Sequence, residues 1–419
     1  MSAAVQRSFD SLSVPNYRRY FAGQVVSLSG NWMQTVAEIW LMLSLTGSGV
    51  AVGLTTALQF LPILLFGAWG GLLADRFEKR RLLIVTQVVM AVPALVLLAV
   101  CVGGVVAPWM VFALVFARGS VNAIDNPTRQ SFVIEMVGAD RVVNAVSLNS
   151  VIVNSARIFG PALAGVLIAT AGIEPCFAVN AASFGAMVLA LWSMNPAQLH
   201  SAPRVEHERG AIRAALRYVR RTPELAVPLG LMALVGTFGL NFQVVLPLLA
   251  RFSFGGDASA YAILISAMGV GSVAGALLTG ARGRADWRVI AGASLAFGML
   301  ALLAAVAPSL ALEIPILALL GAAAVTFAAS VNSALQLAVE PAMRGRVMAL
   351  YSVVFLGSNP IGGPLAGWLS QAYDPRVALA LASVAGLAAA WATRACLARV
   401  RARPRQGPHP REASSAQPV

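Results

Sequence analysis

The sequence predicts an all-α membrane protein with about 12 transmembrane helices in two six-helix bundles. Of its 419 residues, 58% are hydrophobic and 11% are charged, and the mean hydropathy is +0.77. Soluble domains carry roughly a quarter of their residues as charged side chains, so composition excludes that class. The apolar residues form continuous blocks, such as 82–106 and 377–397. Each is near the ~20 residues that a helix needs to cross a ~30 Å hydrocarbon core, and none alternates as a barrel strand would.

The limits of the spans follow from charges and from Gly and Pro turns that bound each block. Spans are expected at 21–45, 50–74, 82–104, 107–127, 143–170, 174–195, 225–250, 258–281, 287–307, 310–335, 346–371 and 375–397. The first 20 residues lack the apolar core of a cleavable signal peptide, so the first span should act as its own anchor.

A charged segment after the sixth span divides the chain into two halves. The expected units are a cytoplasmic N-terminus (1–20), a first bundle (21–196), a cytoplasmic loop (197–224), a second bundle (225–397) and a disordered cytoplasmic tail (398–419). Within the loop, residues 211–221 are expected to form an amphipathic helix on the membrane surface.

The basic residues predict the orientation of the chain. The formal net charge is +13, from 30 Lys and Arg against 17 Asp and Glu. Arg251 and Arg376 fall in loops on one side, and Arg118 and Arg157 fall inside spans. All other Lys and Arg residues fall on the opposite side or at its edge, which the positive-inside rule makes cytoplasmic. An inner (plasma) membrane location with both termini cytoplasmic is expected, and no basic patch indicates a nucleic-acid partner.

A weak internal repeat relates the two halves. The sequence Gly-Pro-Ala-Leu-Ala-Gly at 160–165, near the end of the fifth span, is matched by Gly-Gly-Pro-Leu-Ala-Gly at 362–367, near the end of the eleventh. The tripeptide Ser-Val-Asn occurs at both 120–122 and 330–332. Membrane proteins built from such repeats place their ligand sites between the halves, near mid-depth.

Several spans carry a polar stripe. In the first, Gln24, Ser27, Asn31, Gln34 and Glu38 recur at every third or fourth residue, so they share one helical face. Such a face is very costly against lipid and must meet a wet cavity or polar partners. Similar spacing occurs in the fourth and fifth spans, and isolated amides occur elsewhere. The amides expected to line a central cavity are Asn31, Gln34, Gln59, Asn122, Asn154, Asn241 and Gln336.

Glu38 is the one acidic residue that the sequence places well inside a span. Burial and a nearby arginine act on a carboxyl group in opposite directions, so Glu38 could bind and release a proton. Arg118 and Arg157 are its natural partners, and Asp125 is grouped with them. Two alternatives stay open, namely a permanent structural ion pair and direct contact with a substrate.

Metal, nucleotide and enzyme sites are not expected. The three cysteines, Cys101, Cys176 and Cys396, are far apart in sequence and show no metal-ligand spacing. No glycine-lysine phosphate loop occurs, and no set of paired histidines or cysteines could hold a metal. We therefore expect no catalytic residues, no metal and no cofactor.

The loop after the second span carries a motif. Residues 71–81 read Gly-Leu-Leu-Ala-Asp-Arg-Phe-Glu-Lys-Arg-Arg. This resembles the signature loop of the major facilitator superfamily, with Glu78 in place of a glycine. The resemblance implies the major facilitator fold and a cytoplasmic gate formed by Gly71, Asp75, Arg76, Lys79, Arg80 and Arg81. Positive-inside anchoring would explain the last three residues, but not Gly71 and Asp75. The corresponding loop of the second half has Thr279 in place of the aspartate.

The fifth span contains Gly160, Pro161 and Gly165, which resemble an antiporter motif that marks exporters of that superfamily. The alternative is close helix packing by small residues, which would recur in both halves.

Residues 31–35 (Asn-Trp-Met-Gln-Thr), 45–48 (Leu-Thr-Gly-Ser) and the Asp75-Arg76 pair resemble the branch of enterobactin exporters and macrolide-efflux proteins, the transmembrane secretion effectors. The resemblance implies a proton-coupled exporter of a small amphipathic molecule such as a drug or siderophore. Its expected partners are the lipid bilayer, the small molecule and protons. Uptake or lipid flipping on the same fold stays open, and a membrane enzyme or a receptor is disfavoured. Arg118 and Arg157 would suit an anionic solute, whereas Glu38 would suit a cationic one.

Overall fold

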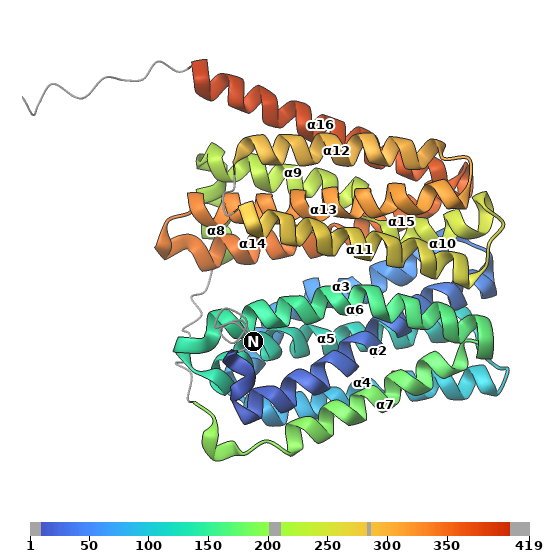
Figure 1. Cartoon of the computed structure of the whole chain (residues 1–419). Helices are drawn as coiled ribbons and strands as arrows, with labels where there is room; N and C mark the ends of the chain where they lie inside the picture. The colour runs from blue at the N-terminus through green and yellow to red at the C-terminus, as the bar shows by residue number, and fades with distance from the viewer. Residues whose placement is uncertain (1–9, 201–210, 283–285, 403–419) are drawn as a thin grey trace, which may run out of the picture.

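The chain folds into two stacked helical bundles whose helix axes are roughly parallel (Figure 1). The computed structural model describes residues 10–200, 211–282 and 286–402. Within these ranges the regular structure is helical, and no strand occurs. The predicted all-α class is confirmed.

The first bundle is formed by α2 (Pro15–Thr46), α3 (Gly49–Arg76), α4 (Lys79–Val102), α5 (Pro108–Val137), α6 (Val142–Ala171) and α7 (Glu174–Trp192). After the surface helix α8 (Ala211–Arg221), the second bundle is formed by α9 (Pro223–Gly239), α10 (Phe242–Leu248) with the π-helix Leu249–Ser253, α11 (Ala258–Arg282), α12 (Trp287–Val306), α13 (Leu310–Ala338), α14 (Arg344–Gly357), α15 (Asn359–Ala372) and α16 (Pro375–Ala402).

Nine segments of the described chain are long and apolar enough to cross a membrane. The helices α2 and α5 and the consecutive pair α14 and α15 lie alongside them, so the described helices are consistent with the predicted twelve spans. Polar side chains lower the mean hydropathy of α2 and α5. The α14–α15 rod is divided into two helices of 14 residues each, and neither is long enough to span alone.

Helix limits differ from the predictions mainly at the ends. The helix α2 begins at Pro15 rather than at residue 21, because proline suits the first helical turn, where its missing N–H is not needed. The helix α16 continues to Ala402, beyond the predicted limit of 397. The predicted helix at 211–221 is present as α8, and it buries Ala215 and Val219. Residues 1–9, 201–210 and 403–419, which hold much of the predicted termini and central loop, lie outside the described residues.

Two spans that the sequence predicted as continuous are broken near the middle. The seventh is interrupted at Leu240 and Asn241, between α9 and α10, and the eleventh is interrupted at Ser358. Pro360, at the first turn of α15, cannot donate a hydrogen bond to the preceding helix, so α14 ends there. Both breaks lie at the space between the bundles, where Leu240 and Ser358 line a cavity.

The two bundles meet tightly at one end. We term the end with the loops at 77–78 and 138–141 the basic end, and the opposite end, with the loop at 47–48, the far end. In the far half, the backbone of α3 at Gly53 packs against the backbone of α15, where an added Cβ would lie 2.9 Å from the carbonyl carbon of Gly363. Ser48 Oγ donates a hydrogen bond of 2.7 Å to Gln371 Oε1. Trp40 of α2 also stacks on Tyr261 of α11, with 6.4 Å between ring centroids.

The sequence repeat has a structural counterpart at this interface. In the first copy, Gly160 packs against Trp32 in its own bundle, and Gly165 packs against Ala262 in the other bundle. In the second copy, Gly362 packs against Asn241 in its own bundle, and Gly367 packs against Gly49 of α3 in the other bundle. These contacts support close helix packing, the alternative interpretation of the motif, in both halves.

These contacts predict the effect of one added methyl group at Gly53. Gly53→Ala places a carbon against the backbone of α15, and overpacking of this kind costs about 1–3 kcal/mol. We expect a lower thermal unfolding midpoint in detergent. Gly185→Ala is the matched control, because no atom lies within 4 Å of its added Cβ. An unchanged midpoint for Gly53→Ala would contradict a tight interface.

Candidate functional site

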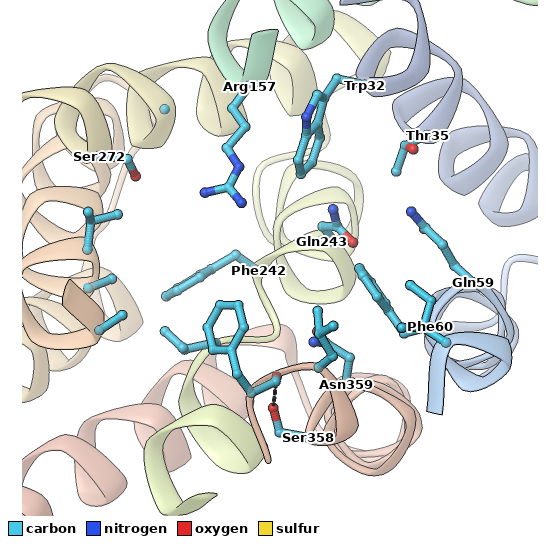
Figure 2. Close-up of a pocket in the computed structure, with 18 of the residues that line it drawn as sticks. Trp32, Thr35, Gln59, Phe60, Arg157, Phe242, Gln243, Ser272, Ser358 and Asn359 are labelled. Atoms are coloured by element: carbon cyan, nitrogen blue, oxygen red, sulfur yellow. Dashed lines mark hydrogen bonds between the residues drawn. The ribbon is translucent and has the colours of Figure 1, made fainter. Parts of the chain in front are cut away.

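A cavity of about 700 Å³ lies between the bundles. It is lined by α2, α3, α5 and α6 of the first bundle and, in the second, by α10, α11, α13, α14, α15 and the residues Leu240 and Ser358 at the two breaks. Figure 2 shows Trp32, Gln59 and Arg157 from one bundle facing Phe242, Gln243 and Ser358 from the other. A volume of this size accommodates one drug-sized molecule.

The predicted cavity residues are brought together only in part. Asn31, Gln59 and Asn122 line the cavity, as do Arg118 and Arg157. The side chain of Asn154 lies outside the described part of the chain.

Three amides expected in the cavity lie elsewhere. Gln34 is fully buried among polar partners of its own bundle. Asn241 turns back onto its own helix and donates to the Thr237 carbonyl oxygen at 2.7 Å, so it helps to satisfy the broken end of α9. Gln336 lies one turn beyond the lining residue Asn332 and donates to its side chain. Helical spacing placed these residues on polar faces, but it could not show which polar group covers them.

Glu38 forms an ion pair with Arg118 inside the first bundle. The side chains are 1% and 2% exposed, respectively. Gln34 Nε2 donates to Glu38 Oε1 at 2.7 Å, and Asn180 of α7 donates in turn to Gln34. This network satisfies the carboxylate on both oxygens, which a buried charge requires.

Arg118 connects this network to the cavity. Arg118 is one of the residues that line the cavity, whereas its partner Glu38 is not among the lining residues. A weaker bond of 3.4 Å runs from Arg118 to Thr35 Oγ1, and the Arg118 Nε is buried without a partner. Arg118 therefore belongs both to the buried network around Glu38 and to the cavity lining.

Arg157 is not brought to Glu38. Its guanidinium lies over the ring of Trp32, 5.4 Å from the centroid, and points into the cavity toward Phe242 (Figure 2). No acidic partner lies within 4.0 Å of it among the described side chains, and its Nε is buried without a hydrogen bond.

Asp125 belongs to a separate network and is not a partner of Glu38. It pairs with Arg129 and accepts from Thr86 Oγ1 at 2.6 Å and from Gln87 Nε2 at 2.9 Å. Arg129 also donates to Gln24 of α2. Arg129, expected on the basic side or at its edge, has its side chain buried one turn beyond Asp125.

The residues of the predicted gate loop contact mainly their own bundle. Lys79 Nζ pairs with Glu135 at the end of α5 at 2.5 Å. Arg80 donates to the carbonyl oxygens of Leu191 and Trp192, which end α7, at 2.8 and 3.0 Å. Arg81 pairs with Glu78. These contacts join α4, α5 and α7 at the basic end, and the gating role remains a prediction.

Sequence reasoning missed several residues. Asn126, Gln243, Asn332 and Asn359 line the cavity beside aromatic rings. Asn126 lies four residues after Asn122, a spacing that could have revealed it. Glu38 is also not the only buried acid. Glu313, in the first turn of α13, is fully buried, and neither of its oxygens has a hydrogen-bond partner. It lies away from the cavity lining.

Comparison with known proteins identifies the family. The family model described as transmembrane secretion effector matches residues 6–414. The chain belongs to the transmembrane secretion effector family. As a member of this family within the major facilitator superfamily, it is a multi-pass membrane transporter and not an enzyme.

Curated relatives of this transmembrane secretion effector include efflux proteins. It is 26% identical over 396 residues to the enterobactin exporter EntS of Citrobacter koseri, which covers 89% of this chain and 88% of that protein. It is 24% identical to the staphyloferrin A transporter of Staphylococcus aureus, over 62% of this chain and 65% of that protein. It is 25% identical to the macrolide efflux protein A of Streptococcus pyogenes, over 38% of this chain and 40% of that protein.

Solved structures share the fold. A POT family transporter in complex with a thioalcohol-conjugated peptide matches with a TM-score of 0.73 and 10% identity, covering 92% of this chain and 96% of that chain. A bacterial homologue of the lysosomal transporter Spinster, inward-facing and occupied, matches with a TM-score of 0.70 and 16% identity, covering 91% and 96%. At these identities the match concerns the fold alone.

The buried ion pair predicts a large loss of stability in one variant. Glu38→Ala leaves Arg118 uncompensated, and breaking a buried pair costs about 3–5 kcal/mol. We expect a strong fall in the thermal unfolding midpoint. Asp10→Ala, which breaks the exposed pair with Arg141, should change it little, because exposed pairs contribute about 0–1 kcal/mol. Equal effects of the two variants would show that the Glu38 pair is not the buried element described.

Proposed function

We propose that this transmembrane secretion effector is a proton-coupled exporter, which exchanges a small amphipathic molecule for protons by alternating access. The observation that carries the proposal is the ion pair between Glu38 and Arg118. Arg118 lines the cavity between the bundles, and Glu38 is its buried partner. A titratable carboxyl in this position links its proton to the charge that the cavity presents to a solute.

Proton binding would act through the ion pair. When Glu38 is ionised, Arg118 is held against the first bundle and its charge is compensated. When Glu38 is protonated, that attraction is lost, and the guanidinium is free to respond to the cavity. In the proposed cycle, solute occupies the cavity while Glu38 is ionised, and a proton loads Glu38 after the solute has left.

The contacts between the two bundles, which we term the seam, support alternating access. The far half of the seam is joined by glycine contacts, by the stacking of Trp40 on Tyr261 and by the Ser48–Gln371 hydrogen bond. Contacts between small residues hold two surfaces closely and can separate without breaking an ion pair. The two broken helices lie beside the cavity, where interrupted helices commonly bind solutes in transporters.

We further propose that the basic end is cytoplasmic, with both termini on that side. The concentration of arginine and lysine at this end supports the assignment. Because the contacts between the bundles lie in the far half, the cavity would then load from the cytoplasm. The export direction is supported by relatives whose names describe an enterobactin exporter and a macrolide efflux protein. In this proposal the gate loop, including Asp75, stabilises one of the two access states.

One observation favours uptake as a second candidate. Because Arg118 lines the cavity, a proton on Glu38 leaves the wall more positive. This would favour the joint entry of a proton and an anion. The two candidates differ in the sign of transport, since energised cells would accumulate the solute instead of expelling it.

The test of coupling is Glu38→Gln, which removes the titratable group and keeps the side-chain volume. A panel of fluorescent dyes and toxic compounds is screened in pump-deficient cells, with and without a protonophore. At equal expression, we expect the variant to lose protonophore-sensitive efflux of any compound that the wild type expels. Glu224→Gln is the matched control, because Glu224 is exposed in the first turn of α9, outside the cavity.

Two results would contradict the proposal. Full proton-driven efflux by Glu38→Gln would exclude Glu38 as the proton carrier. Accumulation of the active compound in energised wild-type cells would replace export with uptake.

A further inference from the structure

We propose that the cavity binds an organic anion with an aromatic body, and that Arg157 is the residue that holds its negative charge. This inference rests on the proposed function, because it names the class of solute that the same cavity would carry. An anionic solute suits the uptake candidate as well as export, since a proton on Glu38 leaves the cavity wall more positive. Four features of the described lining support it, namely its charge, the isolation of Arg157, its aromatic walls and its unused hydrogen-bond acceptors.

The charge of the lining is positive. Among the described lining residues, the ionisable groups that are charged at neutral pH are Arg118 and Arg157, and no Asp or Glu occurs. Glu38, which the sequence analysis matched to a cationic solute, is paired with Arg118 and does not line the cavity. A cationic solute would therefore meet two guanidinium groups without a carboxylate.

Arg157 carries the uncompensated part of this charge. Arg118 has Glu38 as its counter-ion. Arg157 has no acidic partner among the described side chains, and its guanidinium lies over the face of Trp32, 5.4 Å from the ring centroid. A cation–π contact of this kind contributes much less than the cost of a buried, unpaired ion. An anionic group on a solute would supply the missing counter-ion.

The walls around Arg157 suit an aromatic body. Trp32 and Phe242 lie on either side of its guanidinium (Figure 2). Tyr351 and Phe355 also line the cavity, and their rings are stacked with 6.0 Å between centroids. Aromatic rings pack favourably at such separations, so an aryl group beside the anion would extend an existing cluster.

Two lining amides indicate that the solute also donates hydrogen bonds. Asn31 Oδ1 and Gln243 Oε1 are buried acceptors without a partner, and both residues line the cavity. A buried acceptor that lacks a hydrogen-bond donor destabilises the protein. A hydroxyl or amide N–H on the solute would satisfy one of them. The class is therefore an aryl carboxylate or similar anion that carries at least one additional donor.

The experiment uses three probes that share one ring system and one hydroxyl group but differ in charge. These are 6-hydroxy-2-naphthoate, its neutral carboxamide and its cationic amidine. Binding to the purified full-length transporter in detergent is measured by titration calorimetry. The wild type should bind the naphthoate about tenfold or more tightly than the carboxamide, because charge-assisted hydrogen bonds contribute about 1.5–3 kcal/mol. The amidine should bind more weakly than the carboxamide.

Arg157→Gln should abolish the preference for the anion, so that naphthoate and carboxamide bind alike. Arg157→Lys keeps the charge and should keep the preference, which separates a loss of charge from a loss of fold. Arg217→Gln is the matched control, because this arginine is exposed on α8, away from the cavity. It should leave the affinities of all three probes unchanged.

The inference is overturned if the wild type binds the carboxamide or amidine as tightly as the naphthoate, or if folded Arg157→Gln keeps its preference. Transport in cells is scored separately. Proton-driven export without any charge preference would overturn the anion assignment and leave the proposed function standing. A charge preference that Arg157→Gln abolishes, in a protein that expels no compound by proton drive, would support the anion site and contradict the proposed function.

Discussion

The cost of an ionised group inside a bilayer is the constraint on which this structure depends. Glu38 and Arg118 meet it by pairing with each other, and Gln34 and Asn180 hold the carboxylate in place. A second network around Asp125 and Arg129 joins α2, α4 and α5 in the same bundle. These buried bonds favour movement of the first bundle as one body, because separating its helices would expose charges that have no other partner.

The contacts between the bundles are of a different kind. They depend on glycine backbones, on one aromatic stack and on the polar bond between Ser48 and Gln371 in the far half. The repeat uses the same device twice, since Gly165 and Gly367 each approach a helix of the opposite bundle. Rigid bundles and a separable seam are the physical requirements for rocking around a cavity at mid-depth.

The sequence predicted the class of fold because membrane spans and polar stripes depend on composition and helical period alone. It also predicted the Glu38–Arg118 pair, since both residues lie on polar faces of apolar helices. It could not separate the cavity wall from the interior of a bundle, because Asn31 and Gln34 lie on one stripe while only Asn31 reaches the cavity. Burial of Arg129 and Glu313 and the breaks at Asn241 and Ser358 depend on tertiary contacts that helical spacing does not encode.

The central claim is that the far-end seam must open during each transport cycle. Cysteines at Ser48 and Gln371, in a variant with Cys101, Cys176 and Cys396 replaced, place two thiols on adjoining parts of the seam, since an added Cβ at the next residue, Gly49, would lie 3.3 Å from Gln371 Cβ. Transport of an active compound is measured before oxidation, after oxidation and after reduction, with both single-cysteine variants as controls. The account predicts that the disulfide stops transport and that reduction restores it. Unchanged transport by the fully cross-linked protein would contradict it.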